Sequence, residues 1–296
     1  MLDFNYNSNH IEGNTLTYGQ TEVLLLLGEV IGSAKMKDLE EMKAHNICLN
    51  IVEQEADTDE PLTETFIRQV HQVMLREDYK VYRQLPGGET TSYTVHAGRY
   101  KTRPNSVITP TGERFEYASP EETPALMADL VQWYNNAVAE GSLTPIQLAT
   151  LFHYRYIRIH PFEDGNGRIA RLMVNFILHR HKWPMMVIRS KNKKAYLNAL
   201  GLADAAVGPI PADGAHASLK SIVPFVEYME SALTADISSM LEFLSGDKET
   251  MWWYEGEIIR FSTTTPGRIL RVLQSDPNAS LSTISTTLGI SRSAIQ

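Results

Sequence analysis

The chain has 296 residues, of which 43% are hydrophobic, and a formal net charge of −8. This hydrophobic fraction is ordinary for a packed globular protein and excludes a disordered chain, while the length allows one large domain or two. The negative net charge excludes a surface that attracts nucleic acid or anionic membrane as a whole.

The sequence also predicts a cytoplasmic protein that makes no contact with a membrane. The N-terminus lacks the basic region and following apolar run of a signal peptide, and the longest apolar run, 23–27, is too short to span a bilayer. Cys48 is the only cysteine, so no intrachain disulfide is possible. Its apolar helical surroundings predict a small core residue.

The first part of the chain is predicted to be helical. Residues 5–14 are polar and typical of a frayed end, yet Ser8 and Glu12 would share one face of a helical turn. Thr17 would cap a helix that runs to about residue 31, another covers 34 to about 56, and Thr63 would cap a third. The residues expected to face inward are Val23, Leu24, Leu27, Val30, Met36, Leu39, Met42, Ile47, Ile51, Phe66, Val70, Val73 and Met74.

The middle of the chain changes character. Residues 79–90 have no clear period, and 86–88 predict a turn. Residues 91–117 are rich in β-forming residues between turn formers, and 109–112 predict a hairpin turn.

The helical pattern then resumes. A helix is predicted from 120 to about 140, and Thr144-Pro145 predicts the start of another that ends at Ile159. The remaining predicted elements are a motif helix, a helix from 192 to about 202, a loop at 207–217, a long helix at 219–244 and a mixed stretch at 245–257. Residues 264–266 would cap a further helix, and 279–295 resembles a helix-turn-helix with Gly289 at the turn and a recognition helix that starts at Ser291.

The run from His160 to Arg171, His-Pro-Phe-Glu-Asp-Gly-Asn-Gly-Arg-Ile-Ala-Arg, combines residue types suited to a nucleotide polyphosphate. Pro161 disfavours the helical region at His160, so the preceding helix is expected to end there. The loop 165–167 tolerates positive φ and can point backbone N–H groups at one spot. With the N-terminus of the next helix, this loop makes an anion cradle.

Helical spacing places Arg168, Arg171 and Asn175 on one side of the motif helix. Because its flanks are apolar as well, the helix is predicted to be buried on most sides, and buried guanidinium groups need anionic partners. A solvated face for both arginines is the alternative. Asp164 is placed to hold Mg²⁺ against phosphates, and His160 to act as a general base.

The run matches, at every specified position, the signature His-Pro-Phe-x-(Asp/Glu)-Gly-Asn-Gly-Arg-x-x-Arg, and so the chain resembles the Fic family. The resemblance implies an all-α Fic helical domain with a small β-hairpin flap, which transfers AMP from ATP to a hydroxyl side chain of a target protein. It implies the following roles: His160 as the base, Asp164 as the Mg²⁺ ligand, Gly165, Asn166 and Gly167 as the anion hole, and Arg168 and Arg171 as phosphate contacts. The expected division is N-terminal helices with an inhibitory motif (1–60), a Fic core (61–206), a closing helix (207–262) and an incomplete helix-turn-helix or winged-helix-like unit (263–296).

Ser8, Glu12 and Gly13 resemble the family's inhibitory motif, (Ser/Thr)-x-x-x-Glu-(Gly/Asn), which implies that Glu12 pairs with Arg171. A carboxylate on Arg171 takes the place of the terminal phosphate of ATP and repels it. A helix cap with a solvated glutamate is the alternative. The resemblance also implies that a flap at 98–115 clamps a segment of the target protein by strand addition.

The helix after the motif helix offers two candidates for the wall around the adenine, Tyr196 and Asp204, with simple packing as the alternative for Tyr196. The run 179–181, His-Arg-His, invites a metal-site interpretation. That interpretation is rejected, because a basic cluster suits the last turn of a helix without any metal.

Three functional alternatives stay open. The same site could remove AMP, with Glu12 orienting a water, or it could transfer another phosphate-containing group. From a different class, the chain could be a nucleotide-responsive regulator that binds DNA through 263–296. Arg292 is the only positive charge after Arg271, so DNA binding is doubtful, and protein packing or homodimer formation is as plausible for this unit.

Overall fold

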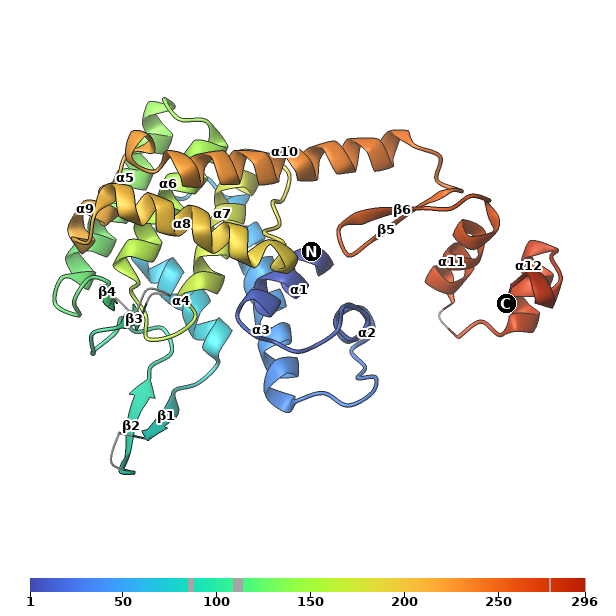
Figure 1. The fold of residues 1–296 in the computed structure, drawn as a ribbon, viewed down its shortest axis with the longest axis horizontal. Helices are drawn as coiled ribbons and strands as arrows, with labels where there is room; N and C mark the ends of the chain where they lie inside the picture. The colour runs from blue at the N-terminus through green and yellow to red at the C-terminus, as the bar shows by residue number, and fades with distance from the viewer. Residues whose placement is uncertain (85–87, 109–113, 277, 296) are drawn as a thin grey trace. The chain divides into compact units, whose positions relative to one another are not determined.

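The computed structural model describes residues 1–84, 88–108, 114–276 and 278–295. Contacts divide the chain into two compact units, Met1–Leu233 and Thr234–Gln296. The boundary falls inside the long helix α10, Val223–Ser245. Figure 1 shows a first unit built mainly of helices and a second unit with a β-hairpin and two helices.

The first unit is organised around α7, the helix of the central motif. Every residue of α7 from Asn166 to Leu178, except Gly167, is buried, and α7 packs against α1, α3, α4 and α6. The helices of this unit, besides α10, are α1 (Leu2–Ile11), α2 (Tyr18–Leu27), α3 (Met36–Ala56), α4 (Glu64–Leu75), α5 (Thr123–Glu140), α6 (Pro145–Ile159), α7 (Asn166–Arg180), α8 (Lys193–Val207) and α9 (Pro211–Ala215), with 3-10 turns at Ser190–Asn192 and Leu219–Ser221.

Three helix starts agree with the prediction. The hydroxyls of Thr17, Thr63 and Thr144 each accept a hydrogen bond from the backbone N–H three residues further along. At Thr17 and Thr144, the side chain of a glutamine at that position accepts a hydrogen bond from the threonine backbone N–H, which completes a capping box. The predicted burial of the motif helix is confirmed and the alternative of a solvated face for its arginines is excluded, because Arg168 is 4% and Arg171 2% exposed.

The predicted inward faces of two helices, α2 and α3, were partly wrong. Helix α2 ends at Leu27 because Gly28 turns left-handed, with φ +74, so Leu27 and Val30 are about half exposed. In α3, Met36 and Ile47 are exposed. The prediction is confirmed for Leu39 and Met42, which are buried with Leu16 and Leu24. The buried face of α3, which packs against α1, α2, α4 and α7, also includes His45, Cys48, Leu49 and Val52.

Two β-hairpins precede α5, where the sequence predicted one. The unpredicted hairpin pairs β1 (Tyr79–Gln84) with β2 (Thr90–Val95), and it projects from the helices in Figure 1. The predicted one pairs β3 (Ser106–Ile108) with β4 (Arg114–Glu116). Apart from Gly88, the turns predicted at 86–88 and 109–112 lie outside the described residues.

The predicted loop at 207–217 contains a short helix, α9. Its position is set by Arg158, which is fully buried and donates hydrogen bonds to the carbonyls of Gly208 and Ile210 at 2.9 Å each. A Cβ at Gly214 of α9 would overlap the Arg158 guanidinium, so the absence of a side chain allows this close approach.

The second unit contains more regular structure than predicted. The stretch predicted as mixed forms most of a hairpin of β5 (Met251–Tyr254) and β6 (Glu257–Arg260). Helices α11 (Thr265–Ser275) and α12 (Leu281–Leu288) follow, and Gly289 ends α12 with φ +65. The expected recognition helix is only a 3-10 turn, Arg292–Ala294, within the described part. None of the helices in the described ranges combines the length and the apolar character needed to cross a membrane.

Candidate active site

His160 is the residue at which α6 ends, and its backbone is left-handed, with φ +51 and ψ +61. Its ring stacks on Tyr117 at a centroid distance of 4.0 Å, and its Nδ1 is buried with no hydrogen-bond partner among the described residues. Burial, and secondarily the charge of Lys101, lowers the pKa of His160 to about 3. The imidazole is therefore neutral near pH 7 and able to accept a proton.

Lys101 fixes the turn that carries His160. Its ammonium is 3% exposed and donates to the carbonyls of Ile159 and His160 at 3.0 and 2.9 Å, and to Asn105 Oδ1 at 2.8 Å. Asn105 Nδ2 donates to the His160 carbonyl as well. Burial lowers the pKa of Lys101 to about 7. Lys101 and Asn105 thus bind the last carbonyls of α6, where the helix dipole favours a cation.

The loop after His160 is held from both sides. Asn166 accepts a hydrogen bond from the Phe162 N–H at 3.0 Å and donates to the Phe162 carbonyl at 2.7 Å. The Phe162 ring lies parallel to that of His71 at 3.7 Å. Gly165 turns left-handed, with φ +79, and α7 begins at Asn166. The first N–H groups of α7 thus stand at a fixed loop, in the arrangement that binds anions.

Asp164 presents the carboxylate of the motif at the edge of this loop. It accepts hydrogen bonds from the Gly165 N–H, at 2.6 Å, and from the hydroxyl of Tyr79 on β1. Burial raises its pKa, but the nearby Arg168 charge and the two hydrogen bonds outweigh burial and hold the pKa of Asp164 below its ordinary value. Because Mg²⁺ is usually bound by one or two carboxylates with phosphate and water oxygens, this single anionic side chain fits that ion.

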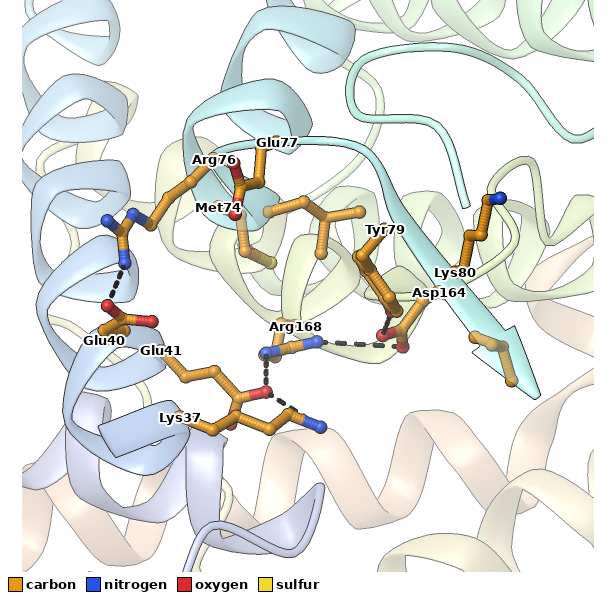
Figure 2. A pocket seen from close by; sticks show the side chains of 12 residues that line it. Lys37, Glu40, Glu41, Met74, Arg76, Glu77, Tyr79, Lys80, Asp164 and Arg168 are labelled. Atoms are coloured by element: carbon orange, nitrogen blue, oxygen red, sulfur yellow. Dashed lines mark hydrogen bonds and ion pairs between the residues drawn. The ribbon is translucent and has the colours of Figure 1, made fainter. Parts of the chain in front are cut away.

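Arg168 lies between Asp164 and α3. Its guanidinium is 3.7 Å from a carboxylate oxygen of Asp164 and 3.7 Å from one of Glu41, and its buried Nε has no partner among the described residues. Figure 2 shows Arg168 between these two carboxylates at the wall of a cavity of about 460 Å³, which α3, the end of α4 and β1 also line. Arg168 is thus buried but only loosely paired, so it can still bind an anion.

Arg171 is bound by the N-terminal helix α1. Its Nη2 donates to Glu12 Oε1 at 2.7 Å and to the Ser8 carbonyl at 2.8 Å, and its Nε donates to Ser8 Oγ at 3.0 Å. Burial opposes the charge of Glu12, but the Arg171 charge and hydrogen bond outweigh burial and hold the pKa of Glu12 below its ordinary value. A Cβ at Gly167 would overlap Glu12 Oε1, so glycine is needed for this contact. Gly13 follows in a left-handed turn, with φ +97.

The two candidates for the adenine wall are already engaged with other side chains. Tyr196 is 3% exposed, and its hydroxyl is 2.9 Å from His153 Nε2. Asp204 accepts a hydrogen bond from Tyr154 at 2.8 Å and pairs with Arg158 at 3.2 Å. Burial raises the pKa of the Tyr196 hydroxyl, but Arg171 lowers this pKa through its charge and a hydrogen bond, and the charge of Glu12 raises it, so Tyr196 lies beside the inhibitory contact. Their role at the adenine stays a prediction.

Several residues near the site escaped the sequence analysis. Lys101, Asn105, Tyr79 and Tyr117 come from the hairpin region and act on His160 or Asp164 across 43 to 85 positions of sequence. A lysine in a β-rich stretch gives no signal of burial.

Comparisons with known proteins point to one family. The model of the Fic/DOC family matches residues 61–178. The crystal structure of a Fic-domain-containing signalling protein from Bacteroides thetaiotaomicron is 55% identical, covers 81% of this chain and 85% of its own, and superposes with a TM-score of 0.75. A structure of Fic-1 from Caenorhabditis elegans is 26% identical, covers 82% of this chain and 63% of its own, and has a TM-score of 0.63.

Curated relatives are more distant. Protein adenylyltransferase fic-1 from Caenorhabditis elegans is 29% identical over 235 residues, which cover 78% of this chain. Its counterpart from Caenorhabditis briggsae is 27% identical over 232 residues. The chain spans 39% of the length of each of these two proteins. The identity with the Bacteroides protein extends over most of both chains, and α6, the loop and α7 carry an uninterrupted signature. The chain is therefore a member of the Fic family.

Proposed function

We propose that the chain is a protein adenylyltransferase, which transfers AMP from ATP to a Ser, Thr or Tyr hydroxyl of a target protein. The observation that carries this proposal is the convergence of a neutral histidine, His160, with a fixed anion-binding loop and two buried arginines. The names of the curated relatives support the same reaction.

The residues divide the reaction between them. His160 takes the proton of the attacking hydroxyl, for which its neutral imidazole is suited. The backbone N–H groups at the start of α7 and the guanidinium groups of Arg168 and Arg171 bind the phosphates and stabilise the charge that develops on them. Most of the acceleration then comes from positioning and charge neutralisation, as in other phosphoryl transfers.

Asp164 would hold Mg²⁺ at this site. Its carboxylate is ionised and lies beside the loop. When bound, the ion neutralises phosphate charge and orients the phosphates.

We propose in addition that Glu12 holds the enzyme inactive. Its carboxylate occupies Arg171 at 2.7 Å, so a terminal phosphate at Arg171 would meet a negative charge. The Glu12 side chain is 39% exposed, whereas Arg171 is 3% exposed, so it is the glutamate that can move. ATP then binds productively only after Glu12 has left.

The target segment is proposed to pair with the flap at 98–115, whose described strands are β3 and β4. A two-stranded ribbon has unpaired edges that accept a further strand, so main-chain hydrogen bonds would place the acceptor hydroxyl without reading its sequence.

The test is transfer of label from ATP labelled at the α-phosphate, with Mg²⁺. Three proteins are compared: wild type, Glu12→Gly, and Glu12→Gly combined with His160→Ala. We expect little label on wild type, much on Glu12→Gly, including self-labelling, and none once His160 is replaced. Equal labelling of wild type and Glu12→Gly would contradict the proposal that Glu12 is inhibitory.

Removal of AMP is the second candidate. It is favoured by the anionic, partly exposed Glu12 carboxylate at the phosphate site, which is suited to orient a water. A pre-modified protein offered to wild type and to Glu12→Gly separates the two activities. Removal requires Glu12, whereas addition requires its displacement.

A further inference from the structure

A chain of hydrogen bonds runs beneath α1 and joins three helices. Asn5 and Ser8 belong to α1, His45 to α3 and Arg171 to α7, and all four are at most 2% exposed. His45 Nδ1 lies 2.6 Å from Asn5 Oδ1, and His45 Nε2 lies 3.1 Å from Ser8 Oγ. Ser8 Oγ in turn lies 3.0 Å from Arg171 Nε.

The direction of every bond in this hydrogen-bond relay is fixed at its two ends. Asn5 Nδ2 donates to Asn46 Oδ1, so Asn5 Oδ1 accepts and His45 Nδ1 carries the hydrogen that it donates. In a neutral ring Nε2 is then unprotonated and accepts the Ser8 hydroxyl hydrogen. A guanidinium N–H can only donate, so Ser8 Oγ accepts from Arg171.

The surroundings of His45 keep it neutral. Burial, together with the positive charges of Arg168 and Arg171, holds the pKa of His45 well below its ordinary value. A protonated ring would donate at both nitrogens, so the Ser8 hydroxyl hydrogen would have no acceptor at His45. Only the neutral ring, with its hydrogen on Nδ1, completes the hydrogen-bond relay.

We propose that His45 is a positioning residue for the inhibitory contact. It orients the Ser8 hydroxyl toward its own ring, so that the oxygen lone pair faces Arg171. Glu12 lies one helical turn after Ser8, so fastening Ser8 to α3 and α7 also fixes Glu12 against Arg171. The effect of this relay on transfer rests on the proposed function, whereas its effect on α1 does not.

The chain offers matched variants. His45→Phe keeps an aromatic ring beside Phe4 but removes both ring nitrogens. His45→Gln keeps one donor and one acceptor at similar positions. Ser8→Ala removes the central hydroxyl. Ser190→Ala is the control, because the Ser190 hydroxyl also bonds α1, at Asn7, but lies outside the relay.

The experiment measures amide hydrogen exchange of residues 2–12 in the full chain without nucleotide. We expect exchange about tenfold faster in His45→Phe and Ser8→Ala, the factor for the loss of roughly one hydrogen bond. His45→Gln should stay near wild type, and so should Ser190→Ala, because the Ser190 backbone N–H still donates to Asn7 Oδ1 at 2.8 Å in that variant. The double variant of Ser8→Ala and His45→Phe should exceed neither single variant by much, because both break one chain.

Label transfer from ATP is then measured on the same proteins, and we expect His45→Phe and Ser8→Ala to gain label while Ser190→Ala does not. Unchanged α1 exchange in His45→Phe would overturn the proposal. If that variant does not fold, unchanged exchange in Ser8→Ala, or exchange in His45→Gln as fast as in Ser8→Ala, overturns it. Faster α1 exchange without label in any variant, Glu12→Gly included, would keep the relay and remove the transferase assignment instead.

Discussion

At the residue scale, the site depends on one strained backbone position. His160 is not a glycine, yet its φ is +51. Such a conformation costs on the order of 1–3 kcal/mol and persists only where surrounding contacts hold it. Lys101 and Asn105 supply those contacts at the His160 carbonyl. The left-handed turn at His160 ends α6, and the His160 ring stacks on Tyr117.

Replacement of Lys101 by methionine tests this support. In the Glu12→Gly background, we expect Lys101→Met to slow label transfer roughly 100-fold, because displacement of a reacting group by about 1 Å has an effect of that size. The pKa of His160 should also rise, since the Lys101 charge is one cause of its low value. Transfer rates and a titration of the His160 ring signals by NMR measure both effects. The exposed Lys194→Met is the control, and an unchanged ring pKa would contradict the assignment.

Tyr79 offers a second test at this scale. Its hydroxyl donates to Asp164, and partners of metal-binding carboxylates typically affect metal affinity 10- to 100-fold. In the Glu12→Gly background, we expect Tyr79→Phe to require about tenfold more Mg²⁺ for half-maximal transfer. A titration of Mg²⁺ at saturating ATP measures this shift. The neighbouring Tyr82→Phe, at an exposed position, should leave the Mg²⁺ dependence unaltered.

That the residues of the motif lie together was predictable, because they follow one another within twelve positions of the sequence. Lys101 and Tyr79 were not, since each acts across dozens of residues and its burial depends on how the hairpins fold back. Asn166 was predicted only in part. Its place in the loop was predicted, but its side chain binds the Phe162 backbone, which the sequence did not indicate.

At the element scale, helix starts were predictable and one hairpin was not. Threonine caps act within three residues, so Thr17, Thr63 and Thr144 could be recognised locally. Strand β1 has no buried residue and mostly exposed ones, so its sequence lacks the alternation that a half-buried strand shows. A strand that is mostly exposed gives no clear periodic signal.

Two buried histidines that join elements predict an acid-sensitive fold. His71 of α4 bonds the backbones of Gly98 and Asp164, and burial lowers its pKa to about 4. Burial lowers the pKa of His153, in α6, to about 3. Between pH 6.5 and these values, the unfolded chain binds protons that the folded chain does not, so stability falls as pH falls. The slope is up to about 1.4 kcal/mol per pH unit for each histidine.

Unfolding by urea at pH 7, 6, 5 and 4.5 measures this slope. We expect the free energy of unfolding to change little from histidine titration above pH 7 and to decrease below 6.5. His71→Phe should reduce the slope, even if it lowers stability at pH 7. A free energy of unfolding that stays constant from pH 7 to 4.5 would be incompatible with neutral buried histidines.

At the scale of the whole molecule, the chain divides at Leu233, inside α10, whereas the sequence suggested a change of character near 263. The apolar pattern of α10 continues through the boundary, so no local signal marks it. All residues of the candidate site lie in the first unit. We therefore expect a chain that ends at Ser245 to keep label transfer in the Glu12→Gly background. Loss of transfer with an intact melting transition would show that 246–296 supports the site.

The shortness of α1 has a consequence for temperature. A helix of ten residues is marginal by itself in water, so α1 is expected to unfold when it leaves α3 and α7. Ordering each backbone residue costs roughly 1–2 kcal/mol of conformational entropy at 25 °C, and the segment recovers this entropy when it is released. Warming thus favours the released, unfolded segment. The fraction of molecules with a free Arg171 should therefore rise with temperature well below the melting point of the unit.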